Sequence, residues 1–381
     1  MSVALTRLLL DTLRLKSRPD HGDLAAKWSS PDVAARADAI AAWLRWERGE
    51  QWLLRRLTDG GALEAAPPPL VASLKRAARE DAKAGMAVDA ATSEVLRLLA
   101  AAGVPCVLLK GPARRAAAAL YPLADARRTL DVDVLVSAAS AELAFRTLGS
   151  AGYAPLYGFD PGHARPGENE FWGPSRHHLR TLTRPGSAAV ELHVSTSWEL
   201  AADVAWERNA SGASEMQWQG HIVRVPSATE LLWHALTHAR PSDPAAWILR
   251  YWLDASAVLA ASDVDWMAIA ARMATSELPD PRRARMWLSA AGQLAGIALP
   301  ATVAPSRPFP LLRLVRWGLA VLARSEATAW RDKLLDEATR TELGLGPAPL
   351  VAGRSWPIHV RRRTASLLAR GGYYAWRALR R

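Results

Sequence analysis

The spacing of apolar residues predicts that the first hundred residues form helices. Apolar positions recur every three or four residues, with breaks at a glycine pair, 60–61, and at three consecutive prolines, 67–69. A longer stretch with the same period follows from about residue 70. It ends at Gly103, as expected where a helix terminates. We therefore expect a helical N-terminal region over residues 1–100.

The pattern changes between residues 101 and 197, where short apolar runs alternate with helical segments. A continuous apolar run of four to eight residues between turn signals is typical of a buried strand. The chain is expected to be of the α+β class, with a mixed β-sheet core between helical N-terminal and C-terminal segments. We expect strands at 104–109, 130–136, 177–183 and 188–194, and helices at 113–120 and 138–151.

Helical spacing returns after residue 198. A small hairpin is predicted around Gln219 and Gly220, with strands at 215–218 and 221–225. Ser227 and Glu230 have the spacing of a capping box, so a helix should begin there. We expect a mainly helical accessory region over 198–300, with further helices at 245–261 and 264–277, and a basic helical region over 301–381.

Composition is that of a folded chain with a sizeable core. Of 381 residues 50% are hydrophobic and 22% are charged, and this length favours two or three structural units. The single cysteine, Cys106, excludes an intramolecular disulfide framework and a multi-cysteine zinc site, which predicts a cytoplasmic protein. No apolar run reaches the roughly 18 residues of a membrane span, so no transmembrane segment is expected.

Positive charge is concentrated at the C-terminal end. The net charge is +11, and residues 346–381 contain eight arginines and no acidic residue. The segment 354–381 also carries leucines and aromatic residues between its arginines. It fits contact with RNA, with an anionic membrane surface or with an acidic partner, and a solvated arginine-rich helix is the plain alternative.

Two aspartates stand within an otherwise apolar strand. Asp131 and Asp133 are two positions apart, so their side chains project from the same face. Two neighbouring carboxylates repel each other unless a cation compensates them, and Mg²⁺ or Mn²⁺ does so through oxygen ligands. The alternative is a solvent-facing edge strand, but the flanking residues are very apolar for an edge.

Glu191 and His193 repeat this arrangement in a second predicted strand. If the two strands are neighbours, Glu191 joins the aspartates in a three-carboxylate site suited to two-metal phosphoryl or nucleotidyl transfer. Glu191 would then help to hold the metal and could accept the proton of an attacking hydroxyl. His193 is a candidate for a supporting or substrate contact, and an exposed strand residue is the alternative for Glu191.

Lys110 and Gly111 follow the first predicted strand and precede a helix, which is a common place to hold phosphate. The pattern is weak by itself, and the chain has no Walker A sequence.

The other candidates are less specific. His234 and His238 lie four residues apart on a helix, but Ala235 replaces the glutamate of a zinc protease, so a core or hydrogen-bonding role is expected. Most of the 17 tryptophans fall at helical spacing and are expected to pack in the interior.

These motifs together resemble the uncharacterised bacterial nucleotidyltransferases of the polymerase-β-like superfamily. The resemblance runs through LLKG, LYP, DVDVLV and VELHV, and continues into PSATELLWHALTH and WLDASA. It implies a nucleotidyltransferase-type core in which Asp131 and Asp133 are metal ligands and Glu191 is the third acidic position. Lys110, Gly111 and Arg127 would lie near the nucleotide phosphates. The family usually has glycine before the first aspartate, where this chain has a leucine.

The leading hypothesis is therefore a Mg²⁺-dependent enzyme that transfers a nucleoside monophosphate from a nucleoside triphosphate to an acceptor hydroxyl, releasing pyrophosphate. RNA such as tRNA, a peptide and a small molecule of a glycan pathway remain open as acceptors. The basic segment also leaves peripheral contact with a membrane open. The rival hypothesis is a non-catalytic binding protein on a nucleotidyltransferase scaffold.

Overall fold

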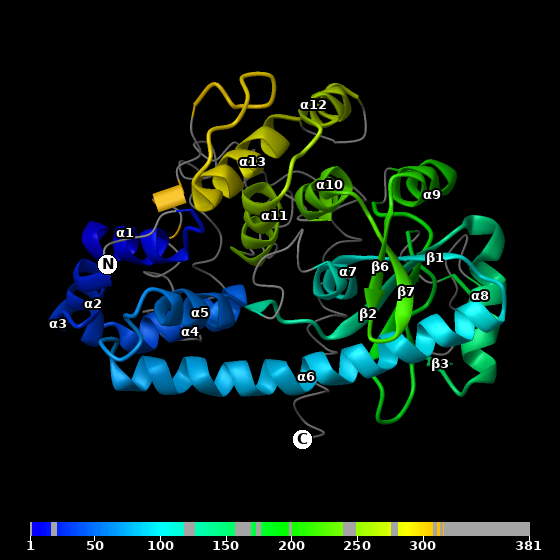
Figure 1. Ribbon diagram of the computed structural model, residues 1–381, viewed down its shortest axis with the longest axis horizontal. Coiled ribbons are helices and arrows are strands. Elements are labelled where there is room, and N and C mark those ends of the chain that lie inside the picture. The colour runs from blue at the N-terminus through cyan, green and yellow to red at the C-terminus, as the bar shows by residue number, and fades with distance from the viewer. Residues whose placement is uncertain are drawn as a thin grey trace, which may run out of the picture. The chain divides into compact units, whose positions relative to one another are not determined.

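A computed structural model describes most of the first three hundred residues (Figure 1). The chain divides into two compact units, Met1–Lys333 and Leu334–Arg381, and every described residue belongs to the first. The basic segment 354–381 and most of the predicted region 301–381 therefore lie outside the described residues. These are 2–16, 21–117, 126–156, 169–172, 177–197, 200–238, 249–275, 281–307, 311–312 and 315.

The described part of the first hundred residues is mainly helical, as the sequence predicts. Trp28 and Trp52 are fully buried among these helices, and their indole nitrogens donate to Thr12 Oγ1 at 3.0 Å and to the Leu13 carbonyl at 3.1 Å. These two tryptophans confirm the expected packing role. The helices are α1 (Val3–Leu13), α2 (His21–Trp28), α3 (Pro31–Ala34), α4 (Ala37–Glu47), α5 (Glu50–Asp59) and α6 (Pro68–Ala101).

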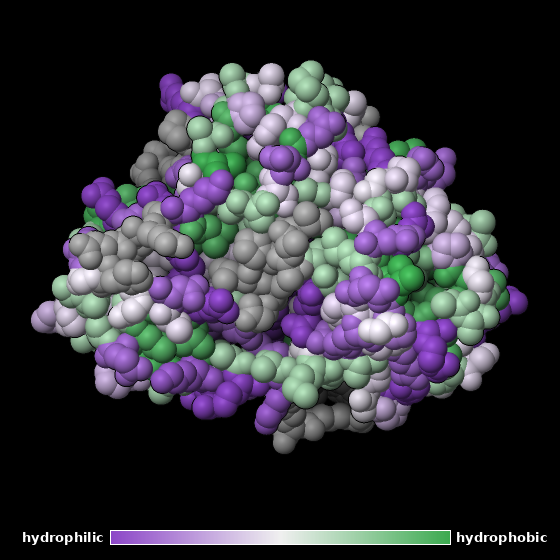
Figure 2. Space-filling view, in the orientation of Figure 1, coloured by the Kyte–Doolittle hydropathy of each residue, from purple (hydrophilic) through white to green (hydrophobic). Residues whose placement is uncertain are grey.

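Helix α6 connects the N-terminal helices to the sheet. Its first half packs against α4 and α5, and its second half reaches α8 and β2 (Figure 1). Lys75, Arg76 and Arg79 on the first half are exposed, and hydrophilic side chains line this side of the molecule (Figure 2). Leu74, Val88 and Leu99 point inward and are almost completely buried. This amphipathic pattern allows one helix to cover two parts of the core.

A five-stranded mixed sheet forms the core, in the order β1-β2-β5-β4-β3. Strands β2 and β5 at its centre are parallel, whereas β1 pairs antiparallel to β2, and β4 pairs antiparallel to both β5 and β3. The α+β class and mixed sheet predicted from the sequence are thus confirmed. The elements are β1 (Cys106–Leu108), α7 (Lys110–Ala116), β2 (Asp131–Val136), a 3₁₀ turn η2 (Ala138–Ser140), α8 (Ala141–Ser150), β3 (Ala154–Pro155), β4 (Leu182–Thr183) and β5 (Ala189–His193).

The predicted hairpin after this core is also present. Gln219 and Gly220 both have positive φ, at 48° and 81°, as a two-residue turn between twisted strands requires. Ser227 caps the next helix through the Glu230 amide at 3.3 Å, while the Glu230 carboxylate pairs with Arg272 instead of completing the capping box. The elements are α9 (Ala202–Ser211), β6 (Ser214–Trp218), β7 (His221–Val225), α10 (Ala228–His238), α11 (Leu249–Ala261), α12 (Trp266–Ala274) and α13 (Pro281–Ala295).

Where the structure describes the chain, no helix combines the length and the hydrophobicity that crossing a bilayer would require.

Candidate active site

The two central strands bring the predicted acidic residues together. In the parallel register of β2 and β5, Asp133 lies directly opposite Glu191, and Asp131 lies opposite Ala189. Val132 and Val134 alternate with the aspartates and are completely buried on the other face. Because side chains alternate along a strand, the same pairing places Glu191 and His193 on the face of Asp133.

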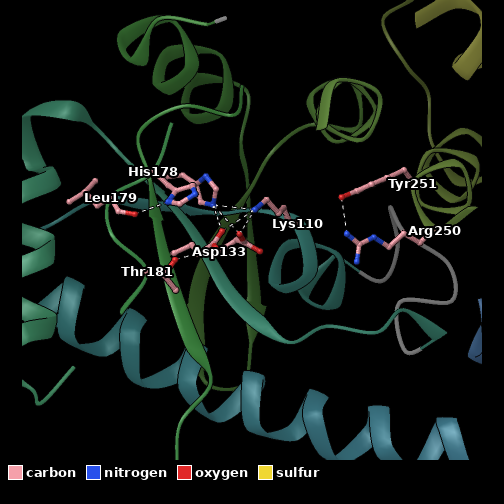
Figure 3. A network of polar contacts seen from close by, with 9 residues as sticks. Lys110, Asp133, His178, Leu179, Thr181, Arg250 and Tyr251 are labelled. Carbon is pink, nitrogen blue, oxygen red and sulfur yellow. Dashed lines mark hydrogen bonds and ion pairs between the residues drawn. The ribbon is translucent and has the colours of Figure 1, made fainter. Parts of the chain in front are cut away.

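Lys110 and His193 complete a compact polar cluster around Asp133, and Figure 3 labels Lys110 and Asp133 within it. The Lys110 ammonium donates to Asp133 Oδ1 at 2.5 Å and lies 3.4 Å from Glu191 Oε2. His193 Nε2 lies 2.9 Å from the same Asp133 oxygen and 3.5 Å from Glu191 Oε2. Thr181 adds a weaker contact, since its hydroxyl donates to Glu191 Oε1 at 3.4 Å. The structure thus gathers four of the residues that the sequence singles out.

Burial and charge act against each other in this cluster. Burial disfavours ionisation of Asp133 and Glu191, but Lys110 and His193 outweigh it and lower the pKa of both carboxyl groups. Burial also disfavours the charged form of Lys110, yet the adjacent carboxylates raise its pKa above the usual value. Asp131 behaves differently: burial and the charge of Asp133 raise its pKa to about 6. Negative charge therefore remains in excess at this face of the sheet.

Three residues of the cluster have the composition and spacing of a metal site. Asp133, Glu191 and His193 each offer one ligand atom, and these atoms lie within 4.8 Å of one another. Asp133 Oδ2 is buried and has no hydrogen-bond partner among the described residues, so a lone pair there is left for a cation. Carboxylate oxygens suit Mg²⁺ and Mn²⁺, and an imidazole can join the ligand set of a transition-metal ion. These side chains fit a divalent metal ion, whereas Asp131 lies outside this group of three.

The backbone at Lys110 and Gly111 has its own packing requirement. Lys110 opens α7 with φ of 44°, a left-handed conformation that is uncommon for a residue with a side chain. A Cβ atom at Gly111 would overlap Thr129 Cγ2 and would lie 2.9 Å from its Oγ1. Glycine is therefore needed here for close packing against the segment that leads into β2. The sequence alone suggests only a phosphate-binding role for this residue.

Arg127 binds a carboxylate from outside the sheet. Its guanidinium donates to both oxygens of Asp254 on α11, at 3.0 and 2.9 Å, and Arg114 Nη2 lies 3.5 Å from the same residue. Asp254 is only 1% exposed. Sequence reasoning missed this partner, although an aspartate inside the apolar helical segment WLDASA was a visible signal. The sequence predicts that Leu130 belongs to the strand of the two aspartates. In the structure β2 begins one residue later, at Asp131, and Leu130 is 41% exposed.

Further histidines surround the cluster. The rings of His177 and His178 lie 5.6 and 5.3 Å from the His193 ring, and the backbone of His178 forms an isolated antiparallel β-bridge with His193. Burial, with the nearby positive charges, lowers the pKa of His177 to about 2, so it is neutral at ordinary pH. His234 is buried on α10, in agreement with the core role expected for it.

Comparison with known proteins identifies the family of this chain. Residues 34–291 match the model of a family described as uncharacterised nucleotidyltransferases. Among solved structures, the chain is similar to the antibiotic-resistance factor ANT(2'')-Ia, determined in solution, with 13% sequence identity and a TM-score of 0.32. That match covers 47% of this chain and 83% of the other. None of the curated proteins matches the sequence.

Proposed function

Since this chain belongs to the uncharacterised nucleotidyltransferase family, we propose that it transfers a nucleoside monophosphate from a nucleoside triphosphate to an acceptor hydroxyl. The observation that carries this proposal is the pairing of Asp133 with Glu191 across the parallel strands β2 and β5. In the transfer, the acceptor oxygen forms a bond to the α-phosphorus, and the bond from that phosphorus to pyrophosphate breaks. The pairing of β2 with β5 brings carboxylates together on one face of the sheet, where they could hold the metal ion that such a reaction requires.

The carboxylates of this cluster would hold Mg²⁺ or Mn²⁺. Asp133 and Glu191 are the proposed ligands, with Asp131 as the third acidic residue and His193 beside them. When bound, the metal ion would supply positive charge that stabilises the developing charge on the phosphoryl oxygens. The proton of the acceptor hydroxyl passes to a carboxylate of the cluster. The sequence names Glu191 as the candidate for this proton acceptor.

The basic side chains near this cluster are proposed to bind the triphosphate. Lys110 lies at the cluster itself, and Arg127 is fixed through Asp254 on the neighbouring helix. Gly111 allows this segment to pack closely against Thr129, which brings Lys110 next to β2. Arg127, which Asp254 holds in place before the reaction, can stabilise phosphate charge without further reorganisation.

The proposed acceptor is RNA such as tRNA, a peptide or a small molecule of a glycan pathway. The basic segment 354–381 is proposed to contact RNA or a membrane surface, and it lies outside the described residues. Deleting it and comparing binding to tRNA with binding to anionic vesicles would separate these two possibilities.

The first experiment measures nucleotide binding by calorimetry with each of the four nucleoside triphosphates and Mg²⁺. We expect Asp133→Asn to lower the affinity for the metal–nucleotide complex at least about tenfold, because it removes a charged ligand of the site. Asp89→Asn is the matched control, since Asp89 pairs with Arg115 and does not contact the cluster. Binding that is unaffected by the Asp133 substitution would overturn the proposal and favour a non-catalytic scaffold.

A further inference from the structure

The Lys110 ammonium lies among the atoms of the candidate metal-ligand group. Its nitrogen is 2.5 Å from Asp133 Oδ1, 3.4 Å from Glu191 Oε2 and 3.3 Å from His193 Nε2. Asp133, Glu191 and His193 are also the residues whose ligand atoms could hold a metal ion. Figure 3 shows the Lys110 side chain directed at Asp133. A cationic group of the protein therefore occupies the centre of this site.

This position is built into the fold. The Leu109 amide donates to the Asp133 carbonyl at 2.9 Å, so the residue before Lys110 is joined to β2 beside the carboxylates. The left-handed backbone of Lys110 and the close packing of Gly111 against Thr129 fix the point from which the lysine side chain extends. Only 13% of that side chain is exposed, so its contacts are not those of a mobile surface lysine.

One ammonium group only partly compensates the charge of the cluster. Asp131, Asp133 and Glu191 offer up to three negative charges, against one on Lys110 and one on His193 when its imidazole is protonated. Asp133 Oδ2 also remains buried without a hydrogen-bond partner among the described residues. A divalent ion would compensate more of this charge, and a lysine at the same position would repel it. Both cations cannot occupy one position.

We propose that Lys110 is the resident counter-cation of this site, that a divalent metal ion displaces its ammonium group, and that the displaced group then meets the nucleotide phosphates. This inference rests on the proposed function, because it assumes that the carboxylates bind a metal ion. It makes Lys110 a positioning residue in the metal-free protein, where it holds Asp133 and Glu191 together. Metal binding and the release of a phosphate-binding lysine become one event.

The first test compares Mn²⁺ binding, without nucleotide, to the wild type and to Lys110→Met, with free Mn²⁺ measured by electron paramagnetic resonance. We expect the variant to have a Kd for Mn²⁺ at least about tenfold lower, because the competing charge is gone. Its melting temperature without metal should fall, and Mn²⁺ should raise that temperature more than in the wild type. Arg115→Met is the matched control: it removes a charge from the same helix, and its Mn²⁺ affinity should stay within about twofold of the wild type.

A second test needs no variant and detects the displacement itself. The wild type is treated with an acetylating reagent with and without Mn²⁺, and modification of Lys110 is followed by mass spectrometry relative to the exposed Lys75. We expect Mn²⁺ to increase the relative modification rate of Lys110 at least about fivefold, since the ammonium leaves its buried contacts.

The outcomes separate this inference from the proposed function. Tight Mn²⁺ binding with equal Kd values for the wild type and Lys110→Met, or with unchanged modification of Lys110, would overturn the displacement and leave the metal site standing. Failure of both proteins to bind Mn²⁺, with or without nucleotide, would overturn the metal site and the inference together.

Discussion

At the scale of single residues, the contact between Gly111 and Thr129 determines how closely α7 approaches β2. Thr129 is buried, and its hydroxyl donates to the Arg127 carbonyl at 3.3 Å. It also lies two residues before Asp131 and faces the glycine without room for a Cβ atom. A substitution of Gly111 or Thr129 is therefore expected to shift the positions of both Lys110 and the aspartates of the candidate site.

Gly111→Ala should lower the free energy of unfolding by about 1–3 kcal/mol, because the added methyl group overlaps Thr129. Urea denaturation measures this loss. Gly149→Ala on α8 is the control: nothing lies within 4 Å of its Cβ position, so alanine should stabilise the helix by up to about 1 kcal/mol.

The double variant Gly111→Ala/Thr129→Ala identifies the cause of the loss. Removing the threonine side-chain atoms should recover part of the stability, as a coupling between two residues in contact. Additive losses from the two substitutions would show that the glycine is required for another reason.

At the scale of elements, α11 is joined to the segment before β2 through Asp254. This carboxylate accepts from Arg127 and lies near Arg114 of α7, so one buried residue connects α11, α7 and the approach to β2. Removing one partner of a buried ion pair is costly, because the remaining charges stay away from water. The helical region after the sheet thus contributes directly to the arrangement of the candidate site.

Asp254→Ala should reduce the free energy of unfolding by about 3–5 kcal/mol, as expected when buried arginines lose their carboxylate partner. Asp59→Asn, which breaks an exposed pair with Arg55 within α5, should cost less than about 1 kcal/mol. Chemical denaturation of both variants tests the comparison, and losses of equal size would contradict this account of Asp254.

Sequence reasoning succeeded where the determining signal is local. The β6–β7 hairpin was predicted to within one residue, because Gln219 and Gly220 mark the turn between alternating strands. Strands β3 and β4 have only two residues each, too few for a periodic pattern, so β3 was missed and β4 was predicted too long.

Contacts between distant residues were harder to predict from the sequence. The adjacency of Asp133 and Glu191 was expected only if their two strands were neighbours, and the structure supplies that condition. The Arg127–Asp254 pair spans 127 residues, and no sequence period indicates it. The position of Lys110 among the carboxylates likewise depends on how three elements pack together.

At the scale of the whole molecule, ion pairs join α6 to several parts of the core. Glu94 pairs with Arg184 at the turn before β5, Asp89 pairs with Arg115 of α7, and Asp81 lies 3.3 Å from Arg128.

The buried imidazole of His234 is a second electrostatic feature. Burial, with nearby Lys110 and Arg114, lowers the pKa of His234 well below its usual 6.5. Stability should therefore depend on pH.

The sign of this dependence follows from linkage. Below about pH 6.5 His234 is protonated in the unfolded chain but not in the folded protein. The free energy of unfolding therefore falls as the pH decreases, and His234 accounts for up to about 1.4 kcal/mol of this fall per pH unit. His234→Gln should flatten the curve of unfolding free energy against pH below 6.5, measured from a baseline near pH 8 where the histidine is neutral in both states. An unchanged slope would show that His234 is protonated in the folded protein.

The parallel pairing of β2 with β5 also determines when the candidate site can form. Asp133 and Glu191 are joined by α8 and two short antiparallel strands, so the whole connection must close before the carboxylates meet. Long-range parallel pairing is slow compared with helix formation, because loop entropy is lost before the contacts form. During synthesis the N-terminal helices can therefore form early, whereas no chain shorter than about 193 residues contains the full cluster. A shorter ribosome-bound fragment would contain the N-terminal helices without the full cluster.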